Sequence, residues 1–212
     1  MNKNNNIVAV IAAHPDDEVL GCGGTLAKWA SEGKEIHILL LSDGESSRIQ
    51  LDKLDIKKRQ DERSDAAEKC ATILGCKSVK QLDFPDNAMS NNILLDVVQA
   101  IEEFIHIHNP SIMLTHHSSD VNIDHRVIHD AVFAACRPQP EMSVKNLLFF
   151  EIPSSTEWNT PSSRNSFCPN WFCDISSTMH KKMEALSIYD QEMRDFPHSR
   201  SYEAIEALAK WR

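Results

Sequence analysis

The feature that most constrains the fold is the alternation of short apolar runs with longer stretches of helical periodicity. The first run, residues 7–13, is continuous and rich in β-branched residues, which is typical of a strand buried on both faces of a parallel sheet. Further strands are predicted at residues 35–42, 78–84, 111–115 and 146–152. Helices are predicted at residues 20–32, 54–74, 92–108, 124–136, 177–193 and 201–211. This order favours an α/β fold, with a Rossmann-like open, mostly parallel sheet and helices on both faces.

The domain organisation is predicted from the length of the chain and from local changes in its composition. A chain of 212 residues fits one domain, and no internal repeat or flexible linker interrupts the pattern, so we expect a single domain over residues 1–212. Residues 154–170 are rich in Ser, Thr, Asn and Pro and are predicted to form a long, substrate-facing loop. We expect residues 153–212, this loop and the last two helices, to complete the substrate side.

Composition excludes several classes of partner. The net charge of −9 argues against nucleic acid, which requires a basic surface. No apolar run reaches the roughly 20 residues of a membrane-spanning helix, and residues 1–6 lack the apolar stretch of a secretory signal. The six cysteines form no CxxC pair, so we expect reduced thiols. We expect a cytoplasmic protein that acts on a small molecule, with a homo-oligomer left open.

Metal-ligating side chains follow the first predicted strand directly, in the sequence AHPDDE at residues 13–18. The carboxyl ends of the strands border the ligand crevice of an open α/β sheet. His14 and Asp17 stand three residues apart across a turn that Pro15 restricts, so both can converge on one point. Adjacent side chains diverge, so of Asp16 and Asp17 one is expected to bind the ion and the other to remain near its bound water. Zinc favours this combination of imidazole nitrogen and carboxylate oxygen.

The third ligand is expected from residues 116–125, which follow the fourth predicted strand. His125 is the candidate because it lies near a predicted helix start, where Asp124 can cap the helix or orient an imidazole. His129, one turn later, is a rival that we interpret as a helix-surface residue. His116 and His117 alternate across the strand end, so one is expected to face the crevice, either as a substrate contact or as part of an ordinary loop.

These residues carry a resemblance. The sequence is similar to the PIG-L/LmbE-like family of zinc-dependent N-acetylglucosaminyl deacetylases, whose signature is AHPDDE after the first strand and a later DH. Residues 13–45, AHPDDEVLGCGGTLAKWASEGKEIHILLLSDGE, match in order and context, and DVNIDHR at residues 120–126 matches the second motif. RSDAAEKCATILG and FPDNAM fit more loosely, and the resemblance spans nearly the whole chain.

The resemblance implies a role for each of these residues. It implies that His14, Asp17 and His125 bind zinc, that Asp16 is the general base and that Arg63 helps to hold the substrate. We add His116 as a substrate contact. Another divalent ion, such as Fe²⁺, can occupy a site with two histidines and one carboxylate, because these ligands discriminate weakly.

One position departs from the family pattern. Family members often have His-Pro-Asp-His at the second motif, where the first His assists the tetrahedral intermediate, whereas this chain has Asn122 at that place. An amide can donate a hydrogen bond but cannot carry a proton. We therefore expect Asn122 to help the oxyanion and Asp124 to orient Asn122 or an imidazole, while Asp16 takes a proton from a water that zinc acidifies and returns it to the leaving amine.

The implied activity is removal of the N-acetyl group from a GlcNAc-like sugar conjugate or from a nucleotide- or glycolipid-linked biosynthetic intermediate, with release of acetate. An amidase acting on a non-sugar amide and a non-catalytic module that binds sugar conjugates are the alternatives. Two single residues also have interpretations without a role in catalysis or binding. Asp16 could serve simply as a helix cap, and Arg63 could simply form salt bridges on a charged helix.

The glycine-rich stretch at residues 21–24 suggests a dinucleotide-binding turn, but the pattern fails. Leu26 occupies the third glycine position, and three carboxylates occupy the turn where a pyrophosphate would lie. We therefore predict that these glycines allow close packing of the helix against the sheet.

Overall fold

A five-stranded sheet forms the centre of the molecule, in the order β3-β2-β1-β4-β5. All neighbouring strands in it are parallel. The computed structural model describes the chain except for residues 1–5, 45–52, 90–92, 161 and 163–164. The strands are β1 (Ile7–Ala12), β2 (Glu35–Ser42), β3 (Ser78–Phe84), β4 (Ile112–His116) and β5 (Asn146–Phe150). The predicted α/β class is confirmed, and the described sheet is wholly parallel.

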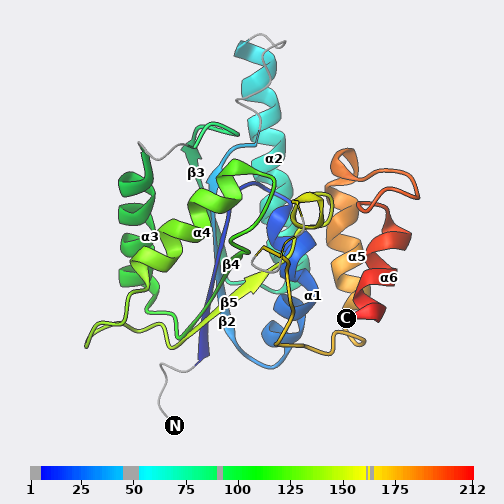
Figure 1. The fold of residues 1–212 in the computed structure, drawn as a ribbon. Helices are drawn as coiled ribbons and strands as arrows, with labels where there is room; N and C mark the ends of the chain where they lie inside the picture. Colours follow the sequence, from blue (N-terminus) through cyan, green and yellow to red (C-terminus); the bar gives the residue numbers. More distant parts are fainter. Residues whose placement is uncertain (1–5, 45–52, 90–92, 161, 163–164) are drawn as a thin grey trace.

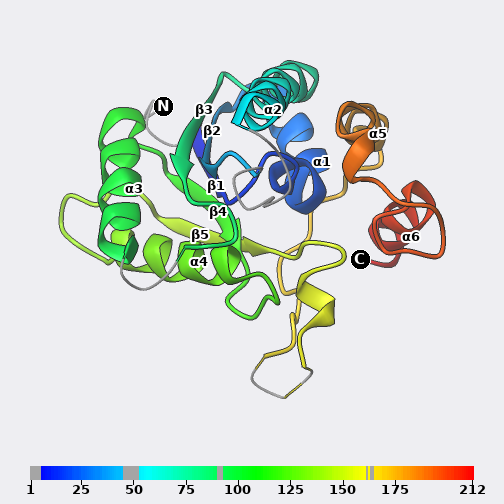
Figure 2. The same ribbon diagram turned by 90° about the horizontal axis from the view of Figure 1, so that it is seen from above.

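Helices cover both faces of the sheet, as Figures 1 and 2 show. The α-helices are α1 (Asp17–Ser31), α2 (Lys53–Leu74), α3 (Leu94–His108), α4 (Ile123–Ala135), α5 (Met179–Ile188) and α6 (Tyr202–Trp211). Two short 3₁₀ helices are η3 (Thr156–Trp158) and η4 (Asp190–Glu192). The helices α3 and α4 lie on one face of the sheet, and α1 and α2 lie on the other. Helix α5 packs against α1 and α2.

The apolar core consists of two clusters, one on each side of the sheet, and β1 contributes to both. Val8 and Val10 pack toward α1 and α2, whereas Ala9 and Ile11 pack toward α3 and α4. This follows from strand geometry, because successive side chains point to opposite faces. A strand buried on both faces must be apolar throughout, which is the pattern that residues 7–13 present.

Gly21 of α1 confirms the predicted close packing against the sheet, and Gly24 packs closely against the C-terminal part of the chain. A Cβ atom on Gly21 would lie 2.3 Å from Cδ2 of Phe150 at the end of β5. A Cβ atom on Gly24 would lie 2.6 Å from Cδ1 of Ile175, in the segment before α5. The glycines therefore bring α1 close both to the sheet and to the C-terminal part of the chain.

The largest differences from the expected elements lie in the C-terminal third. The helix predicted over residues 177–193 is interrupted: α5 ends at Ile188, and the buried Tyr189 turns toward Glu18 before η4 begins. The loop predicted over residues 154–170 contains η3. The predicted start of the third helix, Asn92, lies outside the described residues. The described helices are all too short or too polar to cross a membrane, and the single-domain organisation stays a prediction.

Candidate active site

The candidate site lies between β1 and β4, where the order in which the chain adds strands to the sheet reverses. Strand β1 pairs with β2 on one side and with β4 on the other, so the loops after β1 and β4 border one crevice at the carboxyl ends of the strands. A cavity of about 500 Å³ occupies this position. The residues that line it are His14, Asp16, Asp17, Gly44, Arg63, Asp86, Asn87, Val121, Asn122, Ile123, His125, Ser154, Ser155, Trp158, Glu192 and Arg200.

Three of the predicted residues converge on one point at the floor of this cavity. Oδ2 of Asp17 lies 3.3 Å from Nδ1 of His14 and 3.2 Å from Nε2 of His125. Each of the three offers one ligand atom, and these atoms all lie within 4.8 Å of one another. His14 and Asp17 come from the turn after β1, and His125 from the first turn of α4, so residues more than 100 positions apart share one group of donors.

A carboxylate lies behind each imidazole. Nε2 of His14 lies 3.1 Å from Oδ2 of Asp124 and 3.1 Å from Oδ1 of Asp86. Nδ1 of His125 lies 3.1 Å from Oδ2 of Asp120. In metal sites such carboxylates fix the ring orientation and the tautomer of the ligating histidine. This leaves Nδ1 of His14 and Nε2 of His125 directed at Asp17.

The loops that carry these carboxylates are themselves held by hydrogen bonds. Asp120 accepts from the hydroxyl of Ser155 and from the hydroxyl of Thr156, the latter at 2.7 Å. Asp124 accepts from the backbone N–H of Asn87 at 2.7 Å and from that of Met89 at 3.0 Å. The segments after β3, β4 and β5 are thereby tied together around the two imidazoles.

The electrostatics of this cluster favour a bound cation. Burial by itself lowers the pKa of His14, but hydrogen bonds with Asp124, Asp17 and Asp86 raise it well above its ordinary value. Burial likewise lowers the pKa of His125, but Asp17 and Asp120 raise it to about 9. The carboxylates thus stabilise positive charge at both rings.

The donor set also fits a metal ion. Oδ1 of Asp17 is buried, and among the described residues it makes no hydrogen bond. Two imidazoles and a carboxylate are ligands that zinc accepts. A second group with suitable spacing consists of His14, Asp86 and Asp124, which shares one histidine with the first. The His and Asp residues here could therefore hold a metal ion.

Asp16 stands beside this group in an unusual backbone conformation. Its φ is +125°, which residues other than glycine rarely adopt. It occupies the N-cap position of α1, but its side chain makes no capping hydrogen bond, so the interpretation of Asp16 as a simple helix cap is wrong. Its carboxylate instead meets Nη1 of Arg200 at 3.2 Å. Burial raises the pKa of Asp16 to about 6, although Arg200 opposes the shift.

Asn122 and Asp124 have structural partners as well as a place near the cavity. Oδ1 of Asn122 accepts from the backbone N–H of Asp124 at 2.8 Å and so caps α4. Its Nδ2 donates to Oδ1 of Asn87 at 3.1 Å, and the residue lines the cavity. Asp124 is fully buried and touches His14, which agrees with the expectation that it orients an imidazole.

The other predicted contacts differ in their access to the cavity. Arg63 lines it, donates to the carbonyl of Pro15 at 2.9 Å and pairs with Glu192. The prediction that His116 contacts the substrate needs correction, because this side chain is completely buried and does not line the cavity. Its Nε2 accepts from the backbone N–H of Ala13 at 2.9 Å, and its ring stacks on that of His125. His116 therefore supports the floor of the site.

The remaining histidines near the second motif lie apart from the metal group. Nδ1 of His129 lies 3.0 Å from the carbonyl oxygen of His116, and the His129 ring packs near Phe133 and Phe149. His117 packs edge-on against Phe167. These contacts agree with the interpretation of His129 as a helix-surface residue.

The sequence interpretation missed several residues that line the cavity or contact its histidines. Asp86 follows β3 within FPDNAM, so its position after a strand could have marked it. Asp120 lies within the ligand-rich stretch at residues 116–125 but drew no assignment. Glu192 and Arg200 carried no local signal, because they reach the site only through the packing of the C-terminal segment.

Comparison with known proteins places the chain among proteins of one family. The model of the PIG-L family, described as GlcNAc-PI de-N-acetylase, matches residues 9–136. The chain is 34% identical over 176 residues to the uncharacterized deacetylase YaiS of Escherichia coli K12, an alignment that covers 81% of this chain and 82% of that protein. It is 25% identical over 195 residues to diacetylchitobiose deacetylase of Thermococcus kodakarensis, covering 87% and 69%. It is also 28% identical over 202 residues to 4-oxalmesaconate hydratase of Pseudomonas putida, covering 88% and 74%.

Solved structures of similar fold include deacetylases and a hydratase. The conserved protein TT1542 from Thermus thermophilus superposes with a TM-score of 0.70 at 25% identity, covering 97% of this chain and 86% of that one. GalB, the 4-carboxy-2-hydroxymuconate hydratase from Pseudomonas putida, gives 0.70 at 23% identity, covering 96% and 84%. The zinc-inhibited form of teicoplanin deacetylase Orf2 gives 0.69 at 15% identity, covering 88% and 85%. The family model spans more than half of the sequence, and the chain therefore belongs to the PIG-L family of de-N-acetylases.

Proposed function

We propose that this protein is a metal-dependent hydrolase that removes the N-acetyl group from a GlcNAc-like sugar conjugate and releases acetate. The observation that carries the proposal is the convergence of His14, Asp17 and His125 beside the buried carboxylate of Asp16. Three protein ligands and one open position are the arrangement of catalytic zinc sites. The family membership and the relatives that are deacetylases support the same reaction.

The proposed ligands are His14, Asp17 and His125, with Zn²⁺ or another divalent ion such as Fe²⁺ bound between them. When bound, the ion supplies a Lewis acid that lowers the pKa of a water molecule and polarises the acetamide carbonyl. Asp16 holds the proton that leaves the water, since its carboxylate lines the cavity and is not among the proposed ligands. It then transfers this proton to the amine as the C–N bond breaks.

Asn122 is proposed to stabilise the developing oxyanion. Its oxygen accepts a hydrogen bond at the start of α4 and one N–H of its NH₂ group donates to Asn87, so the second N–H is the proposed donor to a substrate. A hydrogen-bond donor that faces a developing negative charge lowers the barrier, typically by about 3 kcal/mol in oxyanion holes. Proton transfer then rests on Asp16, because an amide cannot deliver a proton.

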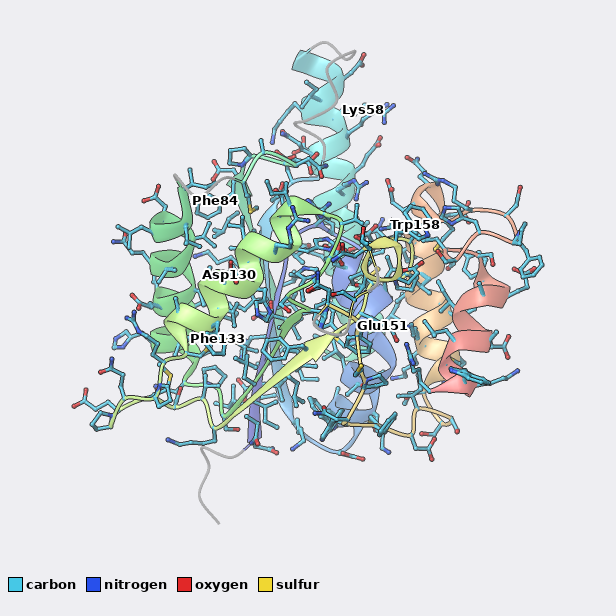
Figure 3. The ribbon with its side chains drawn as sticks, in the orientation of Figure 1. Lys58, Phe84, Asp130, Phe133, Glu151 and Trp158 are labelled. Atoms are coloured by element: carbon cyan, nitrogen blue, oxygen red, sulfur yellow. The ribbon has the colours of Figure 1, made fainter. Side chains whose placement is uncertain are left out.

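The walls of the cavity suit a sugar-sized ligand. Trp158, labelled in Figure 3, is 58% exposed at the end of η3 and lines the cavity. An exposed indole offers a flat apolar surface for one face of a sugar ring. Arg63 of α2, which also lines the cavity, is proposed to donate to sugar oxygens.

The test is acetate release by the purified protein with N-acetylglucosamine, N,N′-diacetylchitobiose and a nucleotide-linked N-acetylglucosamine as substrates. We expect release from at least one of them, loss of activity on chelation and recovery on addition of zinc. Activity that survives complete removal of metal would contradict the metal mechanism. Metal binding without hydrolysis of any amide would favour the non-catalytic binding module.

A second candidate reaction is hydration of an unsaturated carboxylic acid. The observation that favours it is 28% identity over 88% of the chain to 4-oxalmesaconate hydratase, which exceeds the identity to the diacetylchitobiose deacetylase. Both reactions start with removal of a proton from water, and they differ in the carbon that the oxygen attacks. Incubation of the same protein with 4-oxalmesaconate, followed by loss of the conjugated absorbance, separates the two.

A further inference from the structure

We propose that Arg200 is the positioning residue of the Asp16 carboxylate. The inference rests on the proposed function, in which Asp16 is the general base. Arg200 lies in the connection between η4 and α6, 184 residues beyond Asp16 in sequence, and its Nη1 reaches Oδ2 of Asp16 at 3.2 Å. Neither composition nor motif spacing marks this arginine, and only the folded chain brings it to the site.

The guanidinium of Arg200 is held from a second side. Its Nε donates to the carbonyl of Pro153 at 3.2 Å, just after β5. Its own backbone N–H donates to Nδ1 of His198 at 3.0 Å, and the His198 ring packs edge-on against Trp158. A planar guanidinium with fixed donors on two edges presents its remaining N–H groups in a defined direction. Arg200 is therefore a preorganised partner for the carboxylate.

Asp16 needs such a partner because nothing local fixes its side chain. The backbone is held, since the Asp16 N–H donates to Oε2 of Glu18 at 3.1 Å. The carboxylate makes no capping bond, and within the described residues Oδ1 makes no hydrogen bond at all. Arg200 thus engages Oδ2 and leaves Oδ1 as the oxygen that can accept a proton from water.

A second arginine hydrogen-bonds to a different part of the same turn, and its positive charge also acts on the Asp16 carboxylate. Arg63 donates to the carbonyl of Pro15, so it contacts the backbone of the turn, whereas Arg200 contacts the side chain of the proposed base. The difference predicts separate effects. Loss of Arg200 leaves the proposed metal ligands in place but frees the Asp16 carboxylate. Misplacement of a reacting group by about 1 Å can lower the rate about 100-fold.

The experiment compares Arg200→Met and Arg200→Lys with the wild type and with Arg194→Met. Arg194 is the matched control, because its exposed side chain bonds only to the carbonyls of Gln191 and Met193 among the described residues. We measure kcat, KM, bound zinc per chain and the crystal structure of each metal-loaded protein. Because lysine lacks the second edge that reaches Pro153, we expect kcat to fall about 100-fold in Arg200→Met and to recover only in part in Arg200→Lys, with KM changed by less than about threefold and zinc content unchanged.

Two further readouts separate positioning from a general structural role. Methylguanidinium added to Arg200→Ala is expected to restore part of kcat, and the Asp16 carboxylate is expected to turn away from its wild-type position in the Arg200→Met crystal. A rise in KM at constant kcat would overturn the proposal and make Arg200 a substrate contact. An Asp16 carboxylate that keeps its wild-type position in the Arg200→Met crystal would also overturn the positioning proposal. This structural readout needs no activity. Failure of the wild type to deacetylate any of the sugars tested would count against the proposed function alone.

Discussion

The turn at residues 13–18 and the segment at residues 189–200 approach the same cavity from opposite ends of the chain. The turn supplies proposed metal ligands and the proposed base within a few consecutive residues. The C-terminal segment supplies groups that hold the turn: Tyr189 bonds to Glu18, Glu192 pairs with Arg63 and Arg200 pairs with Asp16. The comparison shows that the short spacing within the turn brings the proposed base next to the proposed ligands. The packing of the distant C-terminal segment then holds the turn in position.

The largest expected effect concerns the turn itself. Asp16→Asn removes the carboxylate that accepts a proton from water, and we expect turnover to fall about 1000-fold. Zinc content is expected to stay near that of the wild type, because the three proposed ligands remain. Asp130→Asn, an exposed aspartate on α4 (Figure 3), is the matched control and should leave turnover unchanged. Loss of zinc in Asp16→Asn would mean that the roles of Asp16 and Asp17 are reversed.

The next effect concerns the helix that anchors the C-terminal segment on α1. Lys182 of α5 is buried and donates to the carbonyl of Leu20 at 2.8 Å. Burial lowers its pKa from 10.5 to about 8, although Cys22 and Glu151 oppose the shift. Between these pH values the unfolded chain binds more protons than the folded chain, so this lysine makes the free energy of unfolding rise as the pH rises from about 8 to about 10.5.

The measurement is chemical denaturation of the wild type and of Lys182→Met at several pH values. The lowering of the pKa from 10.5 to about 8 corresponds to about 3 kcal/mol, at about 1.4 kcal/mol per pKa unit. The stability of the wild type relative to Lys182→Met should increase by that order between pH 8 and pH 10.5. Lys181→Met, a change one residue earlier that keeps the buried amine of Lys182, is the matched control. If the free energy of unfolding depended on pH in the same way for the wild type and for Lys182→Met, the lowered pKa of Lys182 would be contradicted.

The smallest effect concerns the hydrogen bond between the two regions. Tyr189→Phe removes the hydroxyl that donates to Oε1 of Glu18 at 3.0 Å and leaves a buried carboxyl oxygen without this donor. We expect a loss of about 1 kcal/mol in the free energy of unfolding, with kcat within about threefold of the wild type. Tyr202→Phe, whose hydroxyl meets Asp190 near the surface, should cost less. A large drop in kcat at unchanged stability would give Tyr189 a role in the reaction.

Much of the fold could be predicted because the information is local. The buried strands appear as continuous apolar runs, and Gly21 and Gly24 mark the closely packed face of α1. The rule that strand ends share one edge of the sheet predicted that the turn at residues 13–18 would meet residues 116–125, whereas the choice of Asp17 over Asp16 as a ligand came from the family resemblance. The burial of His116 could not be predicted, because the alternation of a strand does not say which side chain will be covered by a neighbouring imidazole.

The roles of Asp120 and Arg200 depended on tertiary structure. Asp120 meets His125 five residues later in the sequence, and Ser155 and Thr156 of the segment after β5 donate hydrogen bonds to its carboxylate. Arg200 meets Asp16 because α5 ends at Ile188 and the chain after it returns to the turn at residues 13–18. Neither contact leaves a periodic or spaced pattern in the sequence.

The most direct test of the metal site is a crystal structure of the zinc-loaded protein with anomalous data collected at the zinc edge. We predict one strong peak at about 2.0–2.2 Å from Nδ1 of His14, Nε2 of His125 and a carboxylate oxygen of Asp17. A peak placed instead among Nε2 of His14, Asp86 and Asp124, with His125 beyond coordination distance, would contradict it.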